Sequence, residues 1–499
     1  MRIAFDDAGA REGFRASKTE AAASFGDDRI FIEKFVTQPR HIEIQLLADQ
    51  HGTCLYLGER ECSIQRRNQK VIEEAPSAFL DAATRRAMGE QSVALAQAVG
   101  YTSAGTVEFI VDGARNFYFL EMNTRLQVEH PVTELVTGID IVEQMIRVAD
   151  GQPLGLTQAD IALTGWAMEA RLYAEDPYRN FLPSTGRLTR YRPPVERADP
   201  QSAVRNDTGV IEGGEISVHY DPMVAKLCTW APTRMQAIDG MLDALDGFEV
   251  EGIGHNLPFL SAVMAHPRFR AGTITTAFIA EEYPDGFQGV TPDEDTLRRL
   301  AAVAAHVKLR KEARAAQISG AMAHHQRRIA PDWVVSLGRY SFAVTVAEGP
   351  GGTDVRFQDD GMLRVETGWN LGQTLLCGRV GGVAMVVKVN FIRGGARLRY
   401  RGSDLKIVVR SPRQAELAAM MPEKAPPDMS KVLVCPMPGL VTGIFVAAGD
   451  EVQEGQALAT VEAMKMENIL RAERQGVVAR IRATVGASLK VDEVMLEFE

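Results

Sequence analysis

The chain has few cysteines, no metal-type spacing of ligands and no long apolar run. Its 5 cysteines are scattered among 499 residues, and neither they nor the 9 histidines show the paired spacing of a zinc site. Scattered thiols indicate a reducing compartment. No apolar stretch approaches the length of a membrane-spanning helix, and the first residues lack the apolar core of a signal peptide. We therefore expect no membrane partner and a bacterial cytoplasmic location, with the mitochondrial matrix as the alternative.

The chain also lacks an excess of positive charge. Its formal net charge is −10, which argues against nucleic acid as a partner. Apolar residues make up 45% of the chain, enough for several cores, and the length suggests about three or four domains. Composition shifts predict a multidomain α+β fold with four parts. They are a mixed region at 1–286, a helix followed by strands at 287–412, a proline-rich linker at 413–430 and a small β domain at 431–499.

The second region begins with a helix-start pattern. Thr291 and Pro292 predict a cap followed by proline at the first helical position, and the helix should end near Ala316. Its apolar residues recur at helical spacing and should share one face. They are Leu300, Val303, Ala304 and Val307. Beyond Pro331, apolar and polar residues alternate between glycine pairs, which predicts a run of strands.

An internal repeat organises the last domain. Residues 439–449 align with residues 476–486 after a shift of 37, and the register continues until Glu462 falls on Glu499. Each half alternates apolar residues with turn glycines, which predicts two similar sets of short strands in a small flattened sandwich. Lys465 lies at the midpoint of the repeat. It should project from an exposed connecting hairpin, where a modifying enzyme can reach it.

The residues around Lys465 resemble a known family. Met464, Lys465 and Met466 within such a repeat, preceded by the motif at 435–439, resemble the biotin carrier domain of biotin-dependent carboxylases. The resemblance implies covalent biotin on Lys465, attached by a biotin protein ligase. A lipoyl carrier, which shares the repeat but usually has Asp-Lys-Ala at its tip, is one alternative. A plain exposed lysine is the other.

A dense polar cluster at residues 121–134 follows the apolar stretch 117–120. Alternation along an extended segment would put five polar side chains on one face, which is costly to bury without ligands. They are Glu121, Asn123, Arg125, Gln127 and Glu129. Glu108, on a separate strand, joins Glu121 and Asn123 as oxygen ligands suited to Mg²⁺ or Mn²⁺ holding phosphates. A solvated strand face is the alternative.

This region resembles biotin carboxylase, an ATP-grasp enzyme. The resemblance is carried by residues 31–36, 39–45, 62–76, 121–134, 174–177, 181–186, 205–209 and 220–226. It implies that ATP is contacted by Glu33, Lys34, Val36, His41, Gln65 and Asn68. It implies that bicarbonate is held by Lys70, Arg125, Gln127 and Val128. By the same likeness, Glu129 is the catalytic base, Lys70 and Arg125 assist it, and Arg205 balances charge on biotin. The family often has histidine where this chain has Asn68, although asparagine also donates hydrogen bonds.

Members of this family begin with a nucleotide-fold domain and a glycine-rich flap that closes over ATP. The present sequence opens on residues that resemble the stretch just after that flap. A truncated gene model, a fragment or a partial chain would each explain this start. Each explanation predicts that the 499 residues alone are a poor ATP-dependent carboxylase.

The middle region, 287–412, resembles the helix and antiparallel β-barrel that dock subunits in acyl-CoA carboxylase α-subunits. Residues 280–287 look most like the propionyl-CoA carboxylase family, ahead of the methylcrotonyl- and acetyl-CoA carboxylases. The resemblance implies a carboxyltransferase β-subunit as partner, which alone would bind the acyl-CoA. Two alternatives stay open. One is a non-catalytic carrier and assembly module, and the other is a lipoyl carrier fused to an unrelated ATP-grasp ligase.

Overall fold

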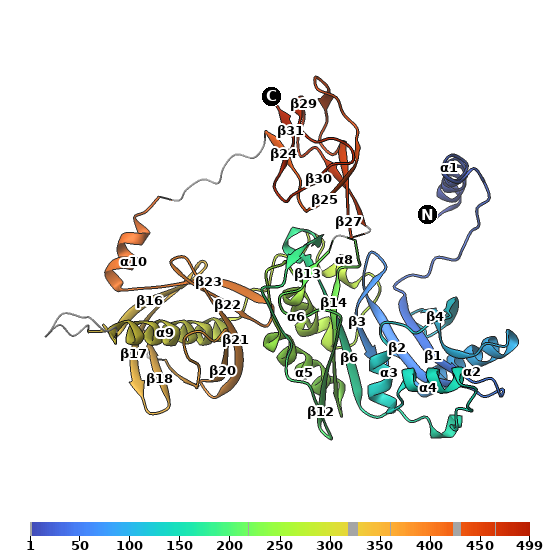
Figure 1. Ribbon diagram of the computed structural model, residues 1–499, viewed down its shortest axis with the longest axis horizontal. Coiled ribbons are helices and arrows are strands. Elements are labelled where there is room, and N and C mark those ends of the chain that lie inside the picture. The colour runs from blue at the N-terminus through green and yellow to red at the C-terminus, as the bar shows by residue number, and fades with distance from the viewer. Residues whose placement is uncertain (1, 218, 318–327, 360, 423–430, 465) are drawn as a thin grey trace.

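The computed structural model describes residues 2–217, 219–317, 328–359, 361–422, 431–464 and 466–499. Three bodies follow one another along the chain, and Figure 1 shows them in the order α/β region, barrel and carrier. Helix α1 (Asp7–Phe25) precedes them and lies apart from the large sheet. Among the described helices, none is long and apolar enough to cross a bilayer.

A nine-stranded sheet organises residues up to 231, and all its neighbouring strands are antiparallel. Its order is β11-β12-β14-β6-β3-β2-β1-β4-β5. The strands are β1 (Arg40–Ala48), β2 (Cys54–Arg66), β3 (Gln69–Ala75), β4 (Ser103–Val111), β5 (Phe117–Asn123), β6 (Trp166–Tyr173), β11 (Arg197–Asp199), β12 (Ser202–Thr208) and β14 (Met223–Ala231). Short pairs surround it: β7 (Glu175–Asp176) with β8 (Leu182–Pro183), β9 (Gly186–Arg187) with β13 (Glu215–Ile216), and β10 (Arg190–Arg192) with β15 (Glu249–Glu251).

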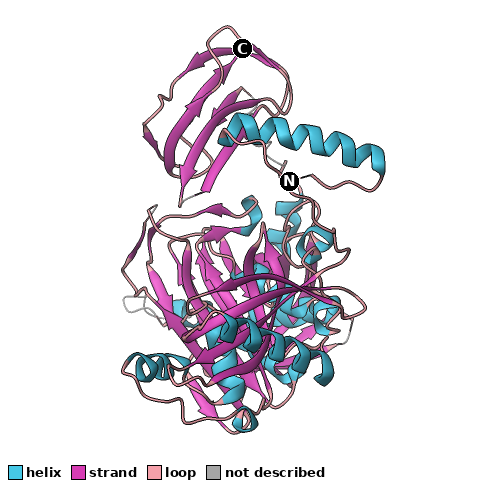
Figure 2. Cartoon of the chain, turned by 90° about the vertical axis from the view of Figure 1, so that its right-hand side faces the viewer, coloured by secondary structure: helices cyan, strands magenta, loops and turns pink. Residues whose placement is uncertain are grey.

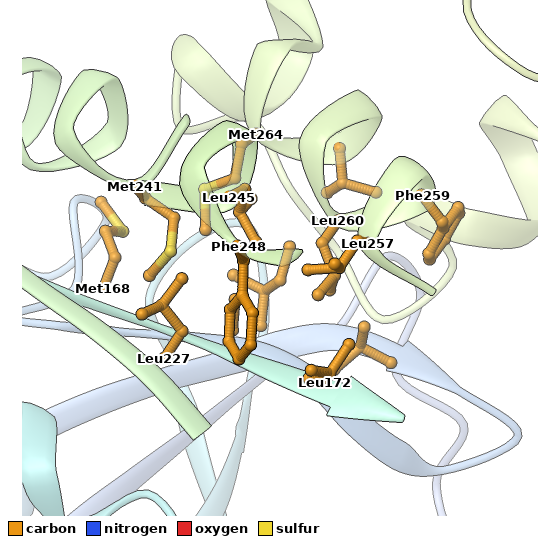
Figure 3. Close-up of a cluster of buried hydrophobic side chains, with 14 of the residues drawn as sticks. Met168, Leu172, Leu227, Met241, Leu245, Phe248, Leu257, Phe259, Leu260 and Met264 are labelled. Atoms are coloured by element: carbon orange, nitrogen blue, oxygen red, sulfur yellow. The ribbon is translucent and has the colours of Figure 1, made fainter. Parts of the chain in front are cut away.

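Helices bury the sheet. They are α2 (Ala82–Ala98), α3 (His130–Thr137), α4 (Ile141–Ala149), α5 (Arg234–Gly247), α6 (Leu257–Ala265), α7 (Pro267–Arg270) and α8 (Phe278–Glu282), with short 3₁₀ turns at Gln158–Asp160 and Pro177–Arg179. Figure 3 shows the largest core, where Met168, Leu172 and Leu227 of β6 and β14 meet apolar side chains of α5 and α6. Burial of such a cluster is the main force that holds helices on a sheet.

Strand β1 shows how this packing creates a polar face. All nine of its residues are buried. Ile42, Ile44 and Leu46 pack in one cluster with Met88 of α2. Since successive side chains point to opposite faces, the intervening odd-numbered residues point to the other side of the sheet. That side therefore carries buried polar groups from the middle of the sheet.

The barrel is closed, because β16 pairs with both β17 and β23. Its strands are β16 (Asp332–Leu337), β17 (Tyr340–Gly349), β18 (Gly352–Phe357), β19 (Met362–Thr367), β20 (Leu375–Val380), β21 (Val383–Ile392), β22 (Gly395–Tyr400) and β23 (Ser403–Arg410). Helix α9 (Glu294–Ala316) runs along it and contacts β16 to β20, β22 and β23. The predicted antiparallel barrel with its long helix is confirmed.

Two details of α9 differ from the prediction. The N-cap is Asp293, whose carboxylate accepts from the backbone N–H of Thr296 at 2.7 Å, so Thr291 and Pro292 precede the helix. Apolar burial is also wider than one face, since every residue from Leu300 to Val307 is buried. Alanines at 301, 302, 304 and 305 allow this, because a small side chain lets strands approach from several directions.

The carrier domain repeats its strands at the predicted shift. Adding 37 to the bounds of β25 (Gly439–Ile444), β26 (Glu451–Val452) and the start of β27 (Ala457–Ala463) gives β29 (Gly476–Ile481), β30 (Ser488–Leu489) and the start of β31 (Val494–Phe498). The same shift places β24 (Val432–Val434) within β28 (Met466–Arg471). Two four-stranded sheets result, β24-β31-β29-β26 and β28-β27-β25-β30. Figure 2 shows this all-β body above the helix-covered sheet.

The segment between barrel and carrier is not linker throughout. Helix α10 (Pro412–Ala419) occupies the start of the expected linker 413–430, capped by Ser411, whose hydroxyl accepts from Gln414 N–H at 3.2 Å. Residues 423–430, which carry most of the proline-rich stretch, lie outside the described residues. Phe287, placed by sequence at the start of the middle region, is buried with Phe259 in the core of the first body.

Candidate active site

A lysine surrounded by three carboxylates marks the centre of the polar face. Lys70 Nζ, on β3, lies 2.6 Å from Glu43 Oε2, 3.0 Å from Glu108 Oε1 and 2.6 Å from Glu129 Oε1. Burial alone would lower the pKa of Lys70, but the Cys62 thiol and these carboxylates outweigh it and raise the pKa. Lys70 is therefore a fixed positive charge, close to groups that can hold or release a proton.

Arg60 binds the same carboxylate, Glu43, that Lys70 contacts. It is fully buried on β2, with Nε 2.5 Å from Glu43 Oε1 and Nη1 donating to Gln45 Oε1 at 2.6 Å. Burial would raise the pKa of Glu43, but Arg60 and Lys70 lower it to about 2. Glu43 is thus a permanent anion that holds two cations in place.

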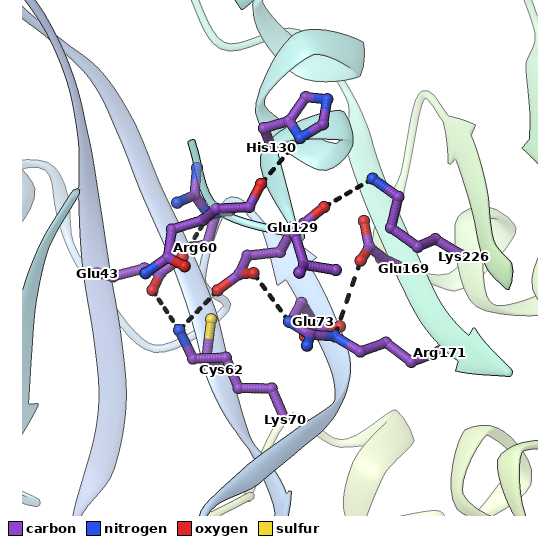
Figure 4. A network of polar contacts seen from close by, with 12 residues as sticks. Glu43, Arg60, Cys62, Lys70, Glu73, Glu129, His130, Glu169, Arg171 and Lys226 are labelled. Atoms are coloured by element: carbon purple, nitrogen blue, oxygen red, sulfur yellow. Dashed lines mark hydrogen bonds and ion pairs between the residues drawn. The ribbon is translucent and has the colours of Figure 1, made fainter. Parts of the chain in front are cut away.

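Glu129 stands between Lys70 and a second cation. It is the N-cap residue of α3, and its Oε2 accepts from Arg171 Nη2 at 2.8 Å (Figure 4). Arg171 Nη2 also lies 2.5 Å from Glu73 Oε1. Glu129 is 1% exposed, so both oxygens are held by protein cations inside the fold. A base in this position has one cation on each side of its carboxylate.

Two further carboxylates lie behind Arg171. Burial raises the pKa of Glu73 to about 7, opposed by Arg171. Burial, reinforced by the Glu73 carboxylate, raises the pKa of Glu169 well above its usual range. Figure 4 shows both on the Arg171 and Lys226 side of Glu129. Near neutral pH, these groups hold protons more readily than exposed carboxylates do.

The predicted metal ligands come together on β4 and β5. Glu108 and Glu121 are cross-strand partners, and Asn123 Nδ2 donates to Glu108 Oε1 at 3.1 Å and to Glu121 Oε1 at 3.3 Å. Two carboxylates and an amide oxygen suit a hard divalent cation. Side-chain atoms of His41, Glu43 and Glu108 also lie close enough to share one ion, so Glu108 belongs to both possible sets.

The predicted nucleotide residues divide into two groups. His41 Nε2 lies 2.9 Å from Glu108 Oε2, and Gln65 Nε2 lies 2.5 Å from His41 Nδ1, so these two join the polar face. The others lie on the surface, although Lys34 Nζ reaches the Tyr118 hydroxyl at 3.4 Å. They are Glu33, Lys34 and Asn68, which are exposed, and Val36, which is half-buried.

The strand expected through residue 129 ends at Asn123. A loop then brings Gln127 Nε2 to Glu108 Oε1 at 3.2 Å, while Arg125 donates to Asn123 Oδ1. The Val128 carbonyl accepts from Lys226 Nζ at 2.8 Å. The alternation of side chains along the strand therefore stops at Asn123. The loop that leads into α3 brings Arg125 and Gln127 back to the residues of β4 and β5. The stretch before it is less buried than expected, since Tyr118, Phe119 and Leu120 are exposed.

Arg205 contacts a different pair of carboxylates from those around Lys70. Its Nη1 donates to Glu134 Oε2 at 2.6 Å, and its Nε donates to Asp207 Oδ1 at 2.7 Å. The cation that contacts Glu129 from this side is Arg171, which lies on β6 whereas Arg205 lies on β12. Strand β14 separates β6 from β12 in the sheet, so Arg205 lies two strands from Arg171, and its role on biotin stays a prediction.

Sequence reasoning missed Glu43, Arg60, Glu73, Glu169 and Arg171. One signal was available: β1 and β6 alternate apolar residues with charged ones, as in Met168, Glu169, Ala170 and Arg171. A strand on a solvated face reads the same way. The choice between the two depends on what covers the polar side.

At the carrier tip, β27 ends at Ala463 and β28 begins at Met466, and these two residues pair. The predicted hairpin is therefore present. Lys465 itself lies outside the described residues.

Family models match four consecutive parts of the chain. A carbamoyl-phosphate synthase L chain, ATP binding domain matches residues 1–157, and a biotin carboxylase C-terminal domain matches 169–281. A propionyl-coenzyme A carboxylase BT domain matches 300–424, and a biotin-requiring enzyme model matches 430–498.

Whole-chain relatives decide the family. The propionyl-CoA carboxylase alpha chain of Ruegeria pomeroyi is 66% identical over 514 residues, spanning 100% of this chain and 76% of the relative. The mitochondrial alpha chain of Mus musculus is 47% identical, spanning 100% of this chain and 69% of the relative. The chain belongs to the propionyl-CoA carboxylase alpha chain family. As a member, it is the α-subunit of a biotin-dependent carboxylase.

A solved relative shows the same ATP-grasp fold. The biotin carboxylase domain of Hydrogenobacter thermophilus 2-oxoglutarate carboxylase, in complex with MgADP, ADP and bicarbonate, has a TM-score of 0.52 and 43% identity. The match covers 57% of this α chain and 61% of the solved one. Fold class, ATP-dependent ligase activity and the biotin carrier, all predicted from the resemblance, are confirmed for this α chain.

Proposed function

We propose that this α chain carboxylates biotin on Lys465 with ATP and bicarbonate, and that a carboxyltransferase β-subunit passes the carboxyl group to propionyl-CoA. The contact of Glu129 with both Lys70 and Arg171 carries this proposal. A base held between two cations suits a reaction that takes a proton from an anion such as bicarbonate. The relatives' names support propionyl-CoA, and the BT domain supports a β-subunit partner.

In this proposal, the cations bind bicarbonate and the carboxylate of Glu129 acts as the base. Lys70 and Arg171 attract bicarbonate and hold it beside Glu129, whose carboxylate takes its proton. Arg125 and Gln127, which meet at 3.4 Å beside Asn123, would orient the anion from the other side. Fixed cations lower the free energy of the negative charge that develops during transfer, without any reorganisation of solvent.

Glu108, Glu121 and Asn123 fit a divalent cation by donor type and proximity. Such an ion would neutralise phosphate charge at the site where His41 and Gln65 meet the polar face. Burial would raise the pKa of Glu108, but the hydrogen bond from His41 and the charge of Lys70 lower it to about 2. Glu108 is therefore anionic at neutral pH and able to bind a metal.

Substitution tests the proposed roles of Glu129, Arg171 and Arg205. In the assembled carboxylase, Glu129→Gln and Arg171→Gln should each lower kcat for biotin carboxylation by about 10²–10⁴, because base and charge act in the transition state. Arg205→Gln should also lower kcat, because its predicted role is to balance charge on biotin. Arg147→Gln, at an exposed arginine of α4, is the control and should stay within about tenfold of the wild type. The KM for ATP should change little in all four, since none is placed on the nucleotide. A loss with Arg147→Gln equal to that with Arg171→Gln would contradict the assignment.

Lys465 is the proposed attachment point for biotin, loaded by a biotin protein ligase. Intact-mass measurement after co-expression with a ligase should show one added biotin per chain, and Lys465→Arg should remove it. Lys431→Arg, in the same domain, is the control and should leave the mass increase unchanged. A lipoyl adduct would refute this assignment.

A further inference from the structure

The carrier domain contacts the first body beside the carrier's own β27–β28 hairpin. Met464, the residue before Lys465, is 2% exposed and belongs to the same buried cluster as Phe181 and Phe259. From the other side, Leu182 packs against the carrier's own core. Arg179 Nη2 lies 3.8 Å from Asp492 Oδ1 on the carrier. Figure 1 shows the end of β27 reaching the body near α8 and β13.

A short loop receives these contacts. We name residues 175–183 the docking loop; it consists of β7, the turn at Pro177–Arg179 and β8. Asn180 and Phe181 both have positive φ, at 54° and 59°. This backbone is costly for residues with a Cβ and persists where the surroundings hold it. It buries Phe181 against Phe259, with ring centroids 4.8 Å apart, and leaves Arg179 and Leu182 facing the carrier.

The docking loop is tied to the hairpin that carries Lys70. Arg66, at the end of β2, stacks over the Phe181 ring at 4.5 Å and donates to Glu175 Oε2 at 2.7 Å. Arg66 also pairs with Gln69 in the β2–β3 hairpin, next to the pair of Gln65 with Lys70. The surface that holds the carrier and the strands that hold the proposed active site are therefore one connected unit.

We propose that the docking loop is the surface on which this chain's own carrier domain is seated when Lys465 is presented to the site at Lys70 and Glu129. Leu182 and the pair of Arg179 with Asp492 are the positioning contacts, and Met464 anchors the tip. The purpose of this docking rests on the proposed function, but the contact itself requires neither ATP nor biotin. We assign the carrier as the occupant for two reasons. Its Asp492 has the charge opposite to Arg179, and its apolar core packs against Leu182.

Cross-linking of the full chain tests the contact directly. Cys377 is exposed and Cys54 is half-buried, so Cys54→Ser with Cys377→Ser gives the background. In it, Arg179→Cys with Asp492→Cys should be joined by a short bis-maleimide about tenfold more than the matched pair Asp239→Cys with Asp492→Cys. Asp239 is exposed on α5, at the opposite end of the body from the carrier. Equal cross-linking of the two pairs would overturn the proposal.

Disruption of the loop gives the second arm. Leu182→Asp should lower the cross-linking of positions 179 and 492 by about tenfold, as expected for a loss of roughly 1.4 kcal/mol. Val195→Asp, at an exposed apolar residue outside the loop, should have no effect. An unchanged yield with Leu182→Asp would contradict its positioning role.

Activity then separates docking from chemistry. In the assembled carboxylase, Leu182→Asp should slow carboxylation of the carrier and leave the rate with free biotin unchanged, whereas Glu129→Gln should lower both. If neither substrate is carboxylated even by the wild type, the proposed function fails while the cross-linking result still decides the docking. If Leu182→Asp slows both substrates equally, the loop is structural and the proposal is wrong.

Discussion

The large sheet and the barrel are both antiparallel and both pack on helices, yet their polar residues have opposite fates. Along β18 of the barrel, Thr353, Val355 and Phe357 are buried, whereas Arg356 is exposed. Along β1 of the sheet, both faces are buried, so its polar side chains are enclosed. The same alternation of apolar and polar residues therefore describes a solvated surface in one body and an active site in the other.

The energetic difference follows from solvation. An exposed charge on the barrel keeps its water, whereas a charge inside the sheet must replace water with a partner. Glu43, Arg60 and Lys70 supply one another with that partner. A comparable group inside the barrel body is His306 of α9, whose Nδ1 lies 2.8 Å from Thr353 Oγ1. Loss of a charge should thus be severe in the sheet and mild on the barrel surface.

Arg60→Met should give the largest effect. It would leave Glu43 buried with one cation fewer and lower the free energy of unfolding of the sheet by about 3–5 kcal/mol. Arg356→Met on the barrel is the matched control and should change its stability by about 0.5 kcal/mol or less. Hydrogen exchange of β1 and β18 peptides measures each body separately.

The double variant Arg60→Met with Glu43→Gln sharpens the comparison. It should recover much of the lost stability, because the glutamine leaves no uncompensated charge. If the double variant were as unstable as Arg60→Met, the loss would reflect packing of the arginine and not its charge.

Acid should destabilise the barrel through His306. Burial, with a smaller contribution from Arg310, lowers the pKa of this imidazole from 6.5 to about 4. The unfolded chain therefore binds the proton first, so stability is full above pH 6.5 and falls as the pH drops toward 4. A pKa lowered from 6.5 to about 4 corresponds to about 3 kcal/mol.

Hydrogen exchange of β18 between pH 7 and pH 4 measures this loss, and His306→Gln should flatten the profile. His51→Gln, outside the barrel, is the control and should leave it unchanged. A wild-type profile that does not differ from that of His306→Gln would mean that another group causes any acid sensitivity.

Helix caps should give the smallest effect and should not distinguish the two bodies. Asp293 caps α9 and Asp140 caps α4, with distances to the capped N–H of 2.7 and 2.8 Å. Asp293→Ala and Asp140→Ala should each cost about 1 kcal/mol, because both caps are on the surface. Urea unfolding followed by exchange of each helix measures this. A much larger cost at one cap would show that the bodies differ in more than their interiors.

Several elements followed from local pattern alone. The shift of 37 residues predicted the paired strands of the carrier, since similar sequences form similar strands. The apolar spacing predicted α9, and α9 ends at Ala316 as expected. Glu108, Glu121 and Asn123 were grouped correctly because β4 and β5 are neighbours in sequence and in the sheet.

Other features depended on strand order. Arg171 reaches Glu129 because β6 pairs with β3. The 90 residues between Ala75, the end of β3, and Trp166, the start of β6, make this pairing long-range. The sequence predicted Arg205 for biotin, and the sheet places this residue two strands from Arg171. A sequence motif also does not tell that Glu33, Lys34 and Asn68 are exposed.

By itself, the sequence determined the family, the helix before the barrel and the strand repeat of the carrier, because these follow from local spacing and composition. The tertiary structure alone decided which cation meets Glu129, that Glu43 joins Arg60 to Lys70, and that Met464 and Leu182 join carrier to body. The physical reason is that burial and pairing of a charge depend on segments far away in the chain, which no local pattern specifies.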